Sequence, residues 1–149
     1  MVASATKTKI AQELEDAWVA LFRAPPAVVE RVNARIRSEG FLTVEWYDVL
    51  WALARSPTGR IRQRDLGKDL LIARYNLSRL IDRLAAEGLV ERVQCPADAR
   101  GFDIVLTDKG RDLRAQTWPV YAQALREEIG ARLSADEQAE LSRLLTKLV

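Results

Sequence analysis

The stretch Ile72–Thr107, IARYNLSRLIDRLAAEGLVERVQCPADARGFDIVLT, predicts a helix followed by a charged β-hairpin. Its first half has apolar residues at the i, i+3, i+4 and i+7 spacing of one helix face, namely Leu77, Leu80, Ile81 and Leu84. Gly88 predicts the C-terminal cap of this helix, which we expect over Ala73–Glu87. The second half has a strand-like run, a turn-forming tip, and a return strand that alternates Phe102, Ile104 and Leu106 with Asp103, Val105 and Thr107.

The face of this helix opposite its apolar side is polar and carries arginine. Successive residues are rotated by about 100°, so Tyr75, Arg79 and Asp82 point away from the apolar face. A shorter helix, expected over Arg62–Leu70, ends only a few residues earlier, which is the arrangement of a helix-turn-helix. We expect side chains at the start of each helix to contact base edges or phosphates of double-stranded DNA: Arg74, Tyr75, Asn76, Ser78 and Arg79 of the longer helix, and Arg62, Gln63 and Arg64 of the shorter one.

The hairpin makes this interpretation more specific. Two amphipathic helices by themselves are equally compatible with an ordinary helix bundle, but a basic hairpin tip beside them is typical of a winged helix. Asp98 and Arg100 lie two residues apart at the tip, so we expect the carboxylate to orient the guanidinium toward the negative potential of a minor groove. The predicted fold class is therefore mainly α with a small β-hairpin wing.

The remaining residues predict helices on both sides of this unit. Before it we expect a helix over Lys7–Phe22 ended by Pro25-Pro26, a second helix that stops near Gly40, and a third that is capped by Thr43 and spans 44–55. After it we expect a long helix over Asp108–Arg132 with a kink at Pro119, and a last helix that begins at the capping box Ser134–Glu137. We expect a single domain over residues 1–149, with a winged helix over 42–107.

Composition excludes several classes of protein. The chain has no histidine and one cysteine, Cys95, which removes imidazole catalysis, histidine metal sites and an internal disulfide framework. It has neither a phosphate-binding G-x-x-x-x-G-K-[ST] motif nor G-x-G-x-x-G. No apolar run is long enough for a membrane span, and the polar N-terminus does not resemble a signal peptide. We therefore expect a cytoplasmic protein that is not an enzyme and has no catalytic residue, metal site, cofactor or membrane partner.

Charge is unevenly distributed. The chain has a net charge of only +2, but Arg55–Arg100 contains ten Arg and Lys residues against six Asp and Glu. This segment alone therefore carries +4, and nine of its ten cations are arginine, which binds phosphate in a bidentate manner. The excess is small, and it supports a nucleic-acid partner only together with the helix and the hairpin.

The sequence resembles the MarR family of winged-helix transcriptional regulators along essentially its whole length. Four stretches carry the resemblance: Leu42-Thr43 followed by Trp46 and Val49-Leu50, then Ser78–Arg92, then Asp98-Ala99-Arg100 as the Asp-x-Arg wing signature, then Leu106-Thr107-x-x-Gly110. Two positions depart from the common pattern, because Ala99 replaces the first of two wing arginines and Leu71 replaces a glycine in the turn. The resemblance implies a repressor that binds a pseudo-palindromic operator as a homodimer.

In this family the N- and C-terminal helices form the dimer interface, which the resemblance places here at about residues 7–40 and 108–149. The apolar stripes of these segments agree with that role, since Ile10, Leu14, Trp18 and Leu21 in one and four leucines in the other are more than the small central unit can bury. The alternative is a monomer in which the terminal helices pack on each other.

Family members commonly sense small aromatic or phenolic molecules between the dimerisation helices and the DNA-binding unit. The candidate residues for such an effector pocket are aromatic side chains and arginines that can meet a carboxylate: Trp18, Arg31, Arg35, Trp46, Tyr47 and Trp51. The alternative is that these rings belong to the core or the dimer interface. Cys95 invites comparison with cysteine-based peroxide sensors, but its place in a wing strand favours a passive apolar role. The rival function is a winged-helix module that binds protein and has no specific DNA binding.

Overall fold

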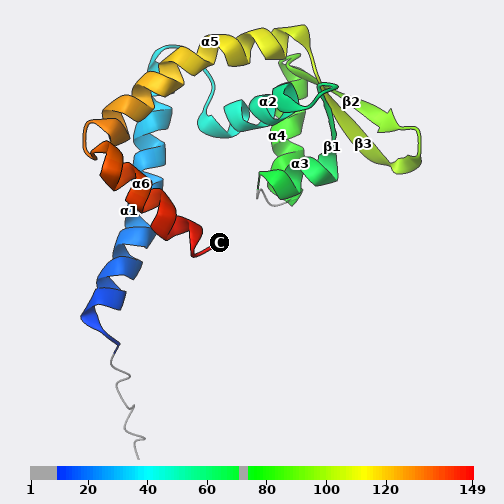
Figure 1. Ribbon diagram of the computed structural model, residues 1–149. Helices are drawn as coiled ribbons and strands as arrows, with labels where there is room; N and C mark the ends of the chain where they lie inside the picture. The colour runs from blue at the N-terminus through cyan, green and yellow to red at the C-terminus, as the bar shows by residue number, and fades with distance from the viewer. Residues whose placement is uncertain (1–9, 71–73) are drawn as a thin grey trace, which may run out of the picture.

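The computed structural model describes residues 10–70 and 74–149 (Figure 1). The elements follow in the order α1 (Gln12–Ser38), α2 (Val44–Arg55), β1 (Arg60–Arg62), α3 (Gln63–Asp69), α4 (Arg74–Ala86), β2 (Val90–Cys95), β3 (Asp98–Leu106), α5 (Asp108–Leu125), a π-helical turn η1 (Arg126–Gly130) and α6 (Ala135–Thr146). The predicted mainly α class with a small sheet is confirmed. Figure 1 shows α2, α3, α4 and the sheet at one end, α1 and α6 at the other, and α5 spanning the two. Among the described helices, none is long and apolar enough to cross a membrane.

The winged-helix end has a closed apolar core. The predicted inner face of α4 lies in it, with Leu77, Ile81 and Leu84 buried and Leu80 packed at its edge. The other buried side chains come from the elements around α4: Val49, Leu50 and Leu53 of α2, Leu66 of α3, Leu89 between α4 and β2, Val90 of β2, and Ile104 and Leu106 of β3. Gly88 has φ +71, and the amide of Leu89 donates to the Leu84 carbonyl, so the predicted helix cap is confirmed.

The sheet has a third strand that the sequence reading missed. The strand order is β1-β3-β2, all antiparallel, with Arg62 of β1 opposite Asp103 of β3. Arg62 was expected to begin a helix, and this is wrong, because it ends a strand and α3 begins at Gln63. A three-residue strand has too little periodicity to be recognised from sequence. It forms because β3 offers an unpaired edge and because Ile61, opposite Ile104, packs on the core.

Pro25 and Pro26 do not interrupt α1, so the prediction of two helices is wrong. Proline has a helix-compatible φ, and its cost in a helix is the lost hydrogen bond and crowding against the preceding turn. The surrounding stretch, residues 10–27, is exposed on all sides in the single chain, which leaves the freed carbonyl groups open to water.

The C-terminal helices also differ from the expectation. The long helix predicted over Asp108–Arg132 continues through Pro119 but becomes a π-helical turn after Leu125. The C-terminal end of α5 packs on the second half of α1. There Val32, Ile36 and Ala124 form a second, smaller core. The capping box at Ser134–Glu137 is confirmed in both directions.

Two threonines at helix starts behave differently. Thr107 accepts a hydrogen bond from the Gly110 amide and thereby caps α5. Thr43 occupies the predicted cap position of α2, but its hydroxyl donates to Glu45 and makes no capping bond. The buried amide of Asn33 in α1 takes over this role, since its Oδ1 accepts from the Val44 amide at 2.8 Å.

The close packing around Gly110 explains why a glycine stands three residues after Thr107. A Cβ at this position would lie 2.1 Å from the carbonyl oxygen of Leu89 and 2.9 Å from Cδ1 of Leu106. Only glycine therefore allows the first turn of α5 to approach the end of α4 and the start of β2 this closely.

Candidate nucleic-acid interface

The outer face of α4 carries the polar side chains that the sequence predicted. Asn76, Arg79 and Asp82 are exposed, and Ser78 is half-buried. Arg74 and Tyr75 form the start of α4, but their side chains lie outside the described part of the structure. Leu71 of the predicted turn and Ala73 of the predicted helix start also lie outside it.

Arg92 of β2 holds this helix in place, and the sequence reading did not identify it. Its guanidinium binds the Asp82 carboxylate and donates to the carbonyl oxygen of Ser78 at 3.1 Å. It also reaches the Ser78 hydroxyl at 3.4 Å and Oε1 of Gln63, in α3, at 3.3 Å. Arg92 thus connects α3, α4 and β2, and both Ser78 and Gln63, predicted DNA contacts, already have a partner within the chain.

The wing, the hairpin formed by β2 and β3, places its basic residue at the exposed end. Arg100 is exposed, as predicted. Asp98 was expected to orient the guanidinium of Arg100, but its observed partners are different. Its Oδ1 accepts from the backbone amide of Arg100, and its Oδ2 accepts from Nη2 of Arg62 at 2.9 Å. The carboxylate therefore fixes the backbone of Arg100, and the guanidinium that it orients belongs to Arg62.

The wing strand alternates as expected only near the core. Ile104 and Leu106 are buried, whereas Phe102 on the same face lies beyond the helices and is 45% exposed. Cys95 is half-buried at the end of β2, and its sulfur is not part of a disulfide. Its passive apolar role stays a prediction.

The six candidate effector residues do not form one site. Trp18 lies in the first half of α1 with its ring 5.9 Å from that of Phe22, Trp46 packs on the winged-helix core, and Trp51 is covered on one side by the Arg55 guanidinium. Arg31 and Arg35 were expected to meet a ligand carboxylate, but both already face the π-helical turn: Arg31 binds Glu128 at 2.5 Å, and Arg35 lies 3.9 Å from Glu127.

Only Tyr47 joins an aromatic cluster, and its partners were missed. Its ring lies 5.0 Å from that of Tyr121 and 6.0 Å from that of Trp118, both in α5. The cluster lies where α2 meets α5, and Asp48 is beside it. The pKa of Asp48 is raised mainly by burial and to a smaller extent by the charge of Glu45. The pKa of Tyr121 is likewise raised mainly by burial, with smaller contributions from Asp48 and Tyr47. The periodicity of α5 is weak because its apolar side chains contact different partners along its length.

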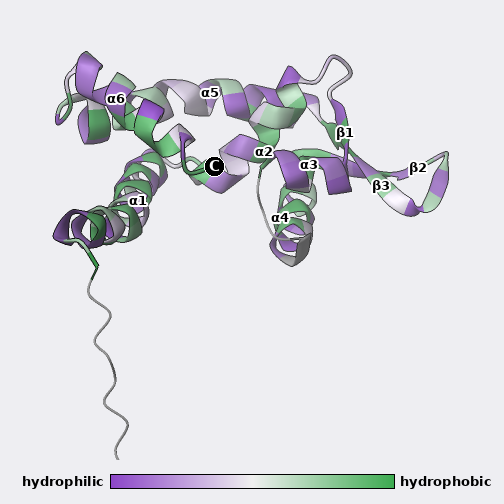
Figure 2. Ribbon diagram, turned by 60° about the horizontal axis from the view of Figure 1, so that its bottom comes forward, coloured by the Kyte–Doolittle hydropathy of each residue, from purple (hydrophilic) through white to green (hydrophobic). Residues whose placement is uncertain are grey.

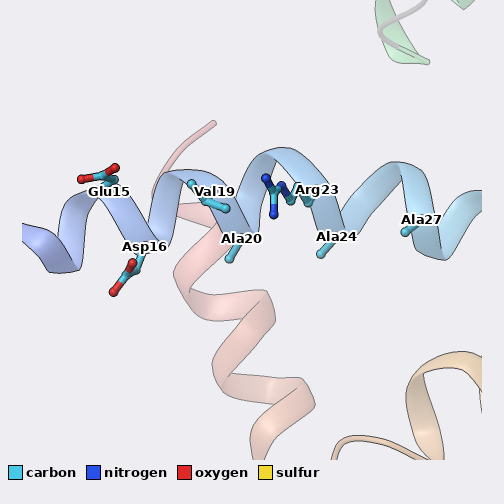
Figure 3. Close-up of a pocket in the computed structure, with 7 residues that line it drawn as sticks. All are labelled: Glu15, Asp16, Val19, Ala20, Arg23, Ala24 and Ala27. Carbon is cyan, nitrogen blue, oxygen red and sulfur yellow. The ribbon is translucent and has the colours of Figure 1, made fainter.

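The terminal helices expose apolar side chains along most of their length. Figure 2 shows hydrophobic stretches on both α1 and α6, and the residues concerned are Leu14, Trp18, Leu21 and Phe22 of α1 and Leu141, Leu144 and Leu145 of α6. Figure 3 shows an open hollow whose lining, including Val19, Ala20, Arg23, Ala24 and Ala27, comes entirely from α1. The hollow is therefore one side of an exposed helix, and within residues 10–70 and 74–149 its lining includes no residue of a second element.

Comparison with known proteins places the fold in a family. The MarR family matches residues 42–101, and the chain is 30% identical over 125 residues to the HTH-type transcriptional regulator YkoM of Bacillus subtilis, 84% of this chain and 79% of that protein. The structure of Sco3205, a MarR family transcriptional regulator from Streptomyces coelicolor in complex with DNA, has a TM-score of 0.85 and 28% identity, covering 95% of this chain and 89% of that one. The chain belongs to the MarR family.

Two other relatives match the chain to different extents. The multiple antibiotic resistance protein MarR of Escherichia coli is 38% identical over 85 residues, which is 57% of this MarR-family chain and 59% of that protein. The chain thus matches less than two thirds of the length of this curated relative. BpsR of Bordetella bronchiseptica, whose DNA binding is regulated by 6-hydroxynicotinic acid, has a TM-score of 0.78 and 27% identity, covering 89% of this chain and 98% of that one.

The family consists of transcription regulators and not of enzymes, in agreement with the composition. Within residues 10–70 and 74–149, no group of three or more Cys, Asp or Glu side chains is arranged to hold a metal ion.

Proposed function

We propose that the chain is a DNA-binding transcriptional regulator that represses its target genes in the cytoplasm. The observation that carries the proposal is the exposed polar face of α4 in a winged helix whose hairpin ends in the exposed Arg100. Side chains on the first turns of α4, Arg74, Tyr75, Asn76 and Arg79, enter the major groove, and Arg100 contacts the flanking backbone or minor groove. Ser78 is left out of this set because its carbonyl and hydroxyl oxygens accept from Arg92. At α3 we assign the phosphate contact to Arg64, whose side chain is 65% exposed, because Gln63 is engaged by Arg92.

The test is fluorescence anisotropy of labelled DNA from upstream of the chain's own gene, titrated with the protein at two salt concentrations. The expected result is saturable binding that weakens steeply with salt and is at least ~1000-fold tighter than binding to unrelated DNA. Equal, weak binding to both DNAs would contradict the proposal and favour the rival function, a winged-helix module that binds protein.

A homodimer is part of this proposal. The DNA-binding unit comprises about residues 42–107, and the exposed apolar faces of α1 and α6 pack against the same faces of a second copy. Two winged helices then face half-sites of a pseudo-palindromic operator about one DNA turn apart, roughly 34 Å. Sedimentation equilibrium is expected to give twice the chain mass of 16.8 kDa, and a monomer at micromolar concentration would contradict it.

The effector part of the proposal is a small aromatic acid or phenol bound near Tyr47, Trp118 and Tyr121. Support comes from the aromatic cluster at the junction of α2 and α5 and from the regulation of the relative BpsR by 6-hydroxynicotinic acid. Hydroxylated aromatic acids, 6-hydroxynicotinic acid included, are added while tryptophan fluorescence and DNA anisotropy are both recorded. A compound that changes both signals in the wild type and neither in Tyr47→Ala supports the site. If no compound in the series changes either signal, this part of the proposal fails.

A further inference from the structure

The wing contains a bulge at the position of its arginine. The pairing of the two strands jumps from Gln94 opposite Phe102 to Cys95 opposite Asp98. Three residues of β3, Ala99, Arg100 and Gly101, therefore have no opposite residue in β2. We call them the wing bulge. Because a bulge redirects the side chains of the strand that contains it, this one decides where Arg100 points.

Three contacts hold the wing bulge. Gln94 donates from Nε2 to the carbonyl oxygen of Ala99 at 3.1 Å, and Asp98 accepts from the amide of Arg100 at 3.0 Å. The third contact comes from outside the hairpin: Arg62 of β1 binds Asp98 and lies across Gly101, so close that a Cβ there would be 2.9 Å from its Nη2 and 3.2 Å from its Nε. Gly101 leaves room for the guanidinium.

We infer that Arg62 is a positioning residue of the wing, which holds the wing bulge through Asp98 and Gly101 so that Arg100 is presented to DNA. This inference rests on the proposed role of Arg100 in DNA binding. Arg62 was expected from sequence to contact phosphate directly. Its side chain is only 23% exposed and is committed to Asp98, and a phosphate contact would require that ion pair to break.

The ion pair is well suited to setting local geometry. Asp98 is 44% exposed, and a partly solvated pair of this kind contributes little to the free energy of unfolding of the whole domain. Its partners, however, lie on two different strands, β1 and the bulged part of β3. Removing it therefore leaves the fold intact and frees the wing bulge.

The test is a double-mutant cycle for affinity to the DNA identified above, with Arg100→Ala measured in several backgrounds. In the wild type we expect Arg100→Ala to weaken binding about tenfold, and in the Arg62→Ala background less than about threefold, because the arginine is already misplaced. Gly101→Ala is the more discriminating background: it removes no charge and displaces the guanidinium, and it should reduce the effect of Arg100→Ala in the same way.

Arg60→Ala is the matched control. Arg60 lies on the same strand and the same face of the sheet as Arg62, and it binds Asp103 at 2.6 Å without touching the wing bulge. In this background Arg100→Ala should still cost about tenfold. If the effects of Arg62→Ala and Arg100→Ala multiply, and Gly101→Ala leaves affinity unchanged, Arg62 contacts phosphate by itself and the inference is overturned.

A second readout needs no DNA and separates the two proposals. Hydrogen exchange of the Arg100 amide in the free protein should be faster in Arg62→Ala and in Gly101→Ala and unchanged in Arg60→Ala. If Arg100→Ala does not affect DNA binding at all, the proposed role of Arg100 fails, and this exchange pattern still supports Arg62 as the residue that holds the wing bulge. Equal exchange rates in all variants would overturn that as well.

Discussion

The winged helix and the terminal helices both carry apolar stripes, but the winged helix covers its own, whereas α6 and the first half of α1 leave theirs exposed. In α4 the residues Leu77, Ile81 and Leu84 are at most 2% exposed, whereas Trp18 of α1 is 61% exposed. The spacing of apolar residues is helical in both. The difference lies in the surroundings, because α4 packs against α2, α3 and the sheet, while every residue from 10 to 27 is exposed in the described part of the chain.

The periodicity of apolar residues thus predicts which face of a helix is buried, but it does not predict which element covers that face. The buried residues of the winged-helix core all lie between Val49 and Leu106, so the single chain supplies both sides of this core. The stripes on α1 and α6 require a surface that the single chain does not supply, which is why a second copy is proposed. The predictions below test this division.

The largest effect is expected in the winged-helix core. Leu53→Ala removes a side chain with no exposure and should lower the free energy of unfolding by about 2–5 kcal/mol. Leu144→Ala in α6 is the matched control, since the same change at a 46% exposed site should cost far less in the monomer. Urea unfolding at low protein concentration measures both. Equal losses would show that the two regions are not different in kind.

The second prediction concerns the terminal helices. Trp18→Ala should weaken self-association by about 2 kcal/mol, roughly 30-fold, as expected of a large aromatic residue in an interface. Trp51→Ala changes another exposed tryptophan, in α2 of the winged helix, and should leave self-association unchanged. Sedimentation equilibrium across a concentration series gives both constants. An unaltered constant for Trp18→Ala would argue that the N-terminal part of α1 lies outside the dimer interface.

The third prediction contrasts one helix cap from each region. Ser134→Ala removes a side chain that accepts the Glu137 amide hydrogen in the capping box of α6 and should cost about 1 kcal/mol. Thr43→Ala removes no capping bond from α2, because Asn33 provides it, and should cost less than about 0.5 kcal/mol. Thermal unfolding of the two variants decides. A larger loss for Thr43→Ala would show that its hydroxyl does cap α2.

The smallest effects come from two carboxylates with opposite pKa shifts. The pKa of Asp48 is raised mainly by burial and to a smaller extent by the charge of Glu45. Its ionised form therefore destabilises the fold once the pH exceeds the ordinary aspartate pKa. Hydrogen bonds from Arg31 and Arg132 lower the pKa of Glu128, so its ionised form stabilises the fold at neutral pH, and this contribution is lost as the pH falls through its lowered pKa.

Asp48→Asn should therefore be more stable than the wild type at neutral pH, and Glu128→Gln less stable. Both differences should disappear in acid, where the wild-type carboxyl groups are protonated. Unfolding midpoints measured from pH 3 to 8 test the sign of each difference, and the same sign for both variants would contradict these assignments.

Local patterns explain which parts of the fold were predictable. The apolar face of α4, the cap at Gly88, the capping box at Ser134 and the hairpin all depend on residues close together in sequence. The errors depend on contacts between distant segments: β1 pairs with β3 across some forty residues, and Asn33 caps α2 from α1. The polar outer face of α4, the helix proposed to contact DNA, is predictable from sequence, but the roles of Arg92, which holds this helix, and of Arg62, which reaches the wing, are not.

The sequence by itself determined the two helices of the helix-turn-helix, the hairpin that follows them, the polar outer face of α4 and the exposed arginine of the wing, because each follows from the spacing of side chains along one element. Only the tertiary structure decided the partners of those side chains. Asp98 pairs with Arg62 and not with the guanidinium two residues away, and Tyr47 packs on Trp118 and Tyr121 and not on the other predicted pocket residues. The physical reason is that charge and aromatic contacts act over a few ångströms, and only the packed chain sets which residues lie that close.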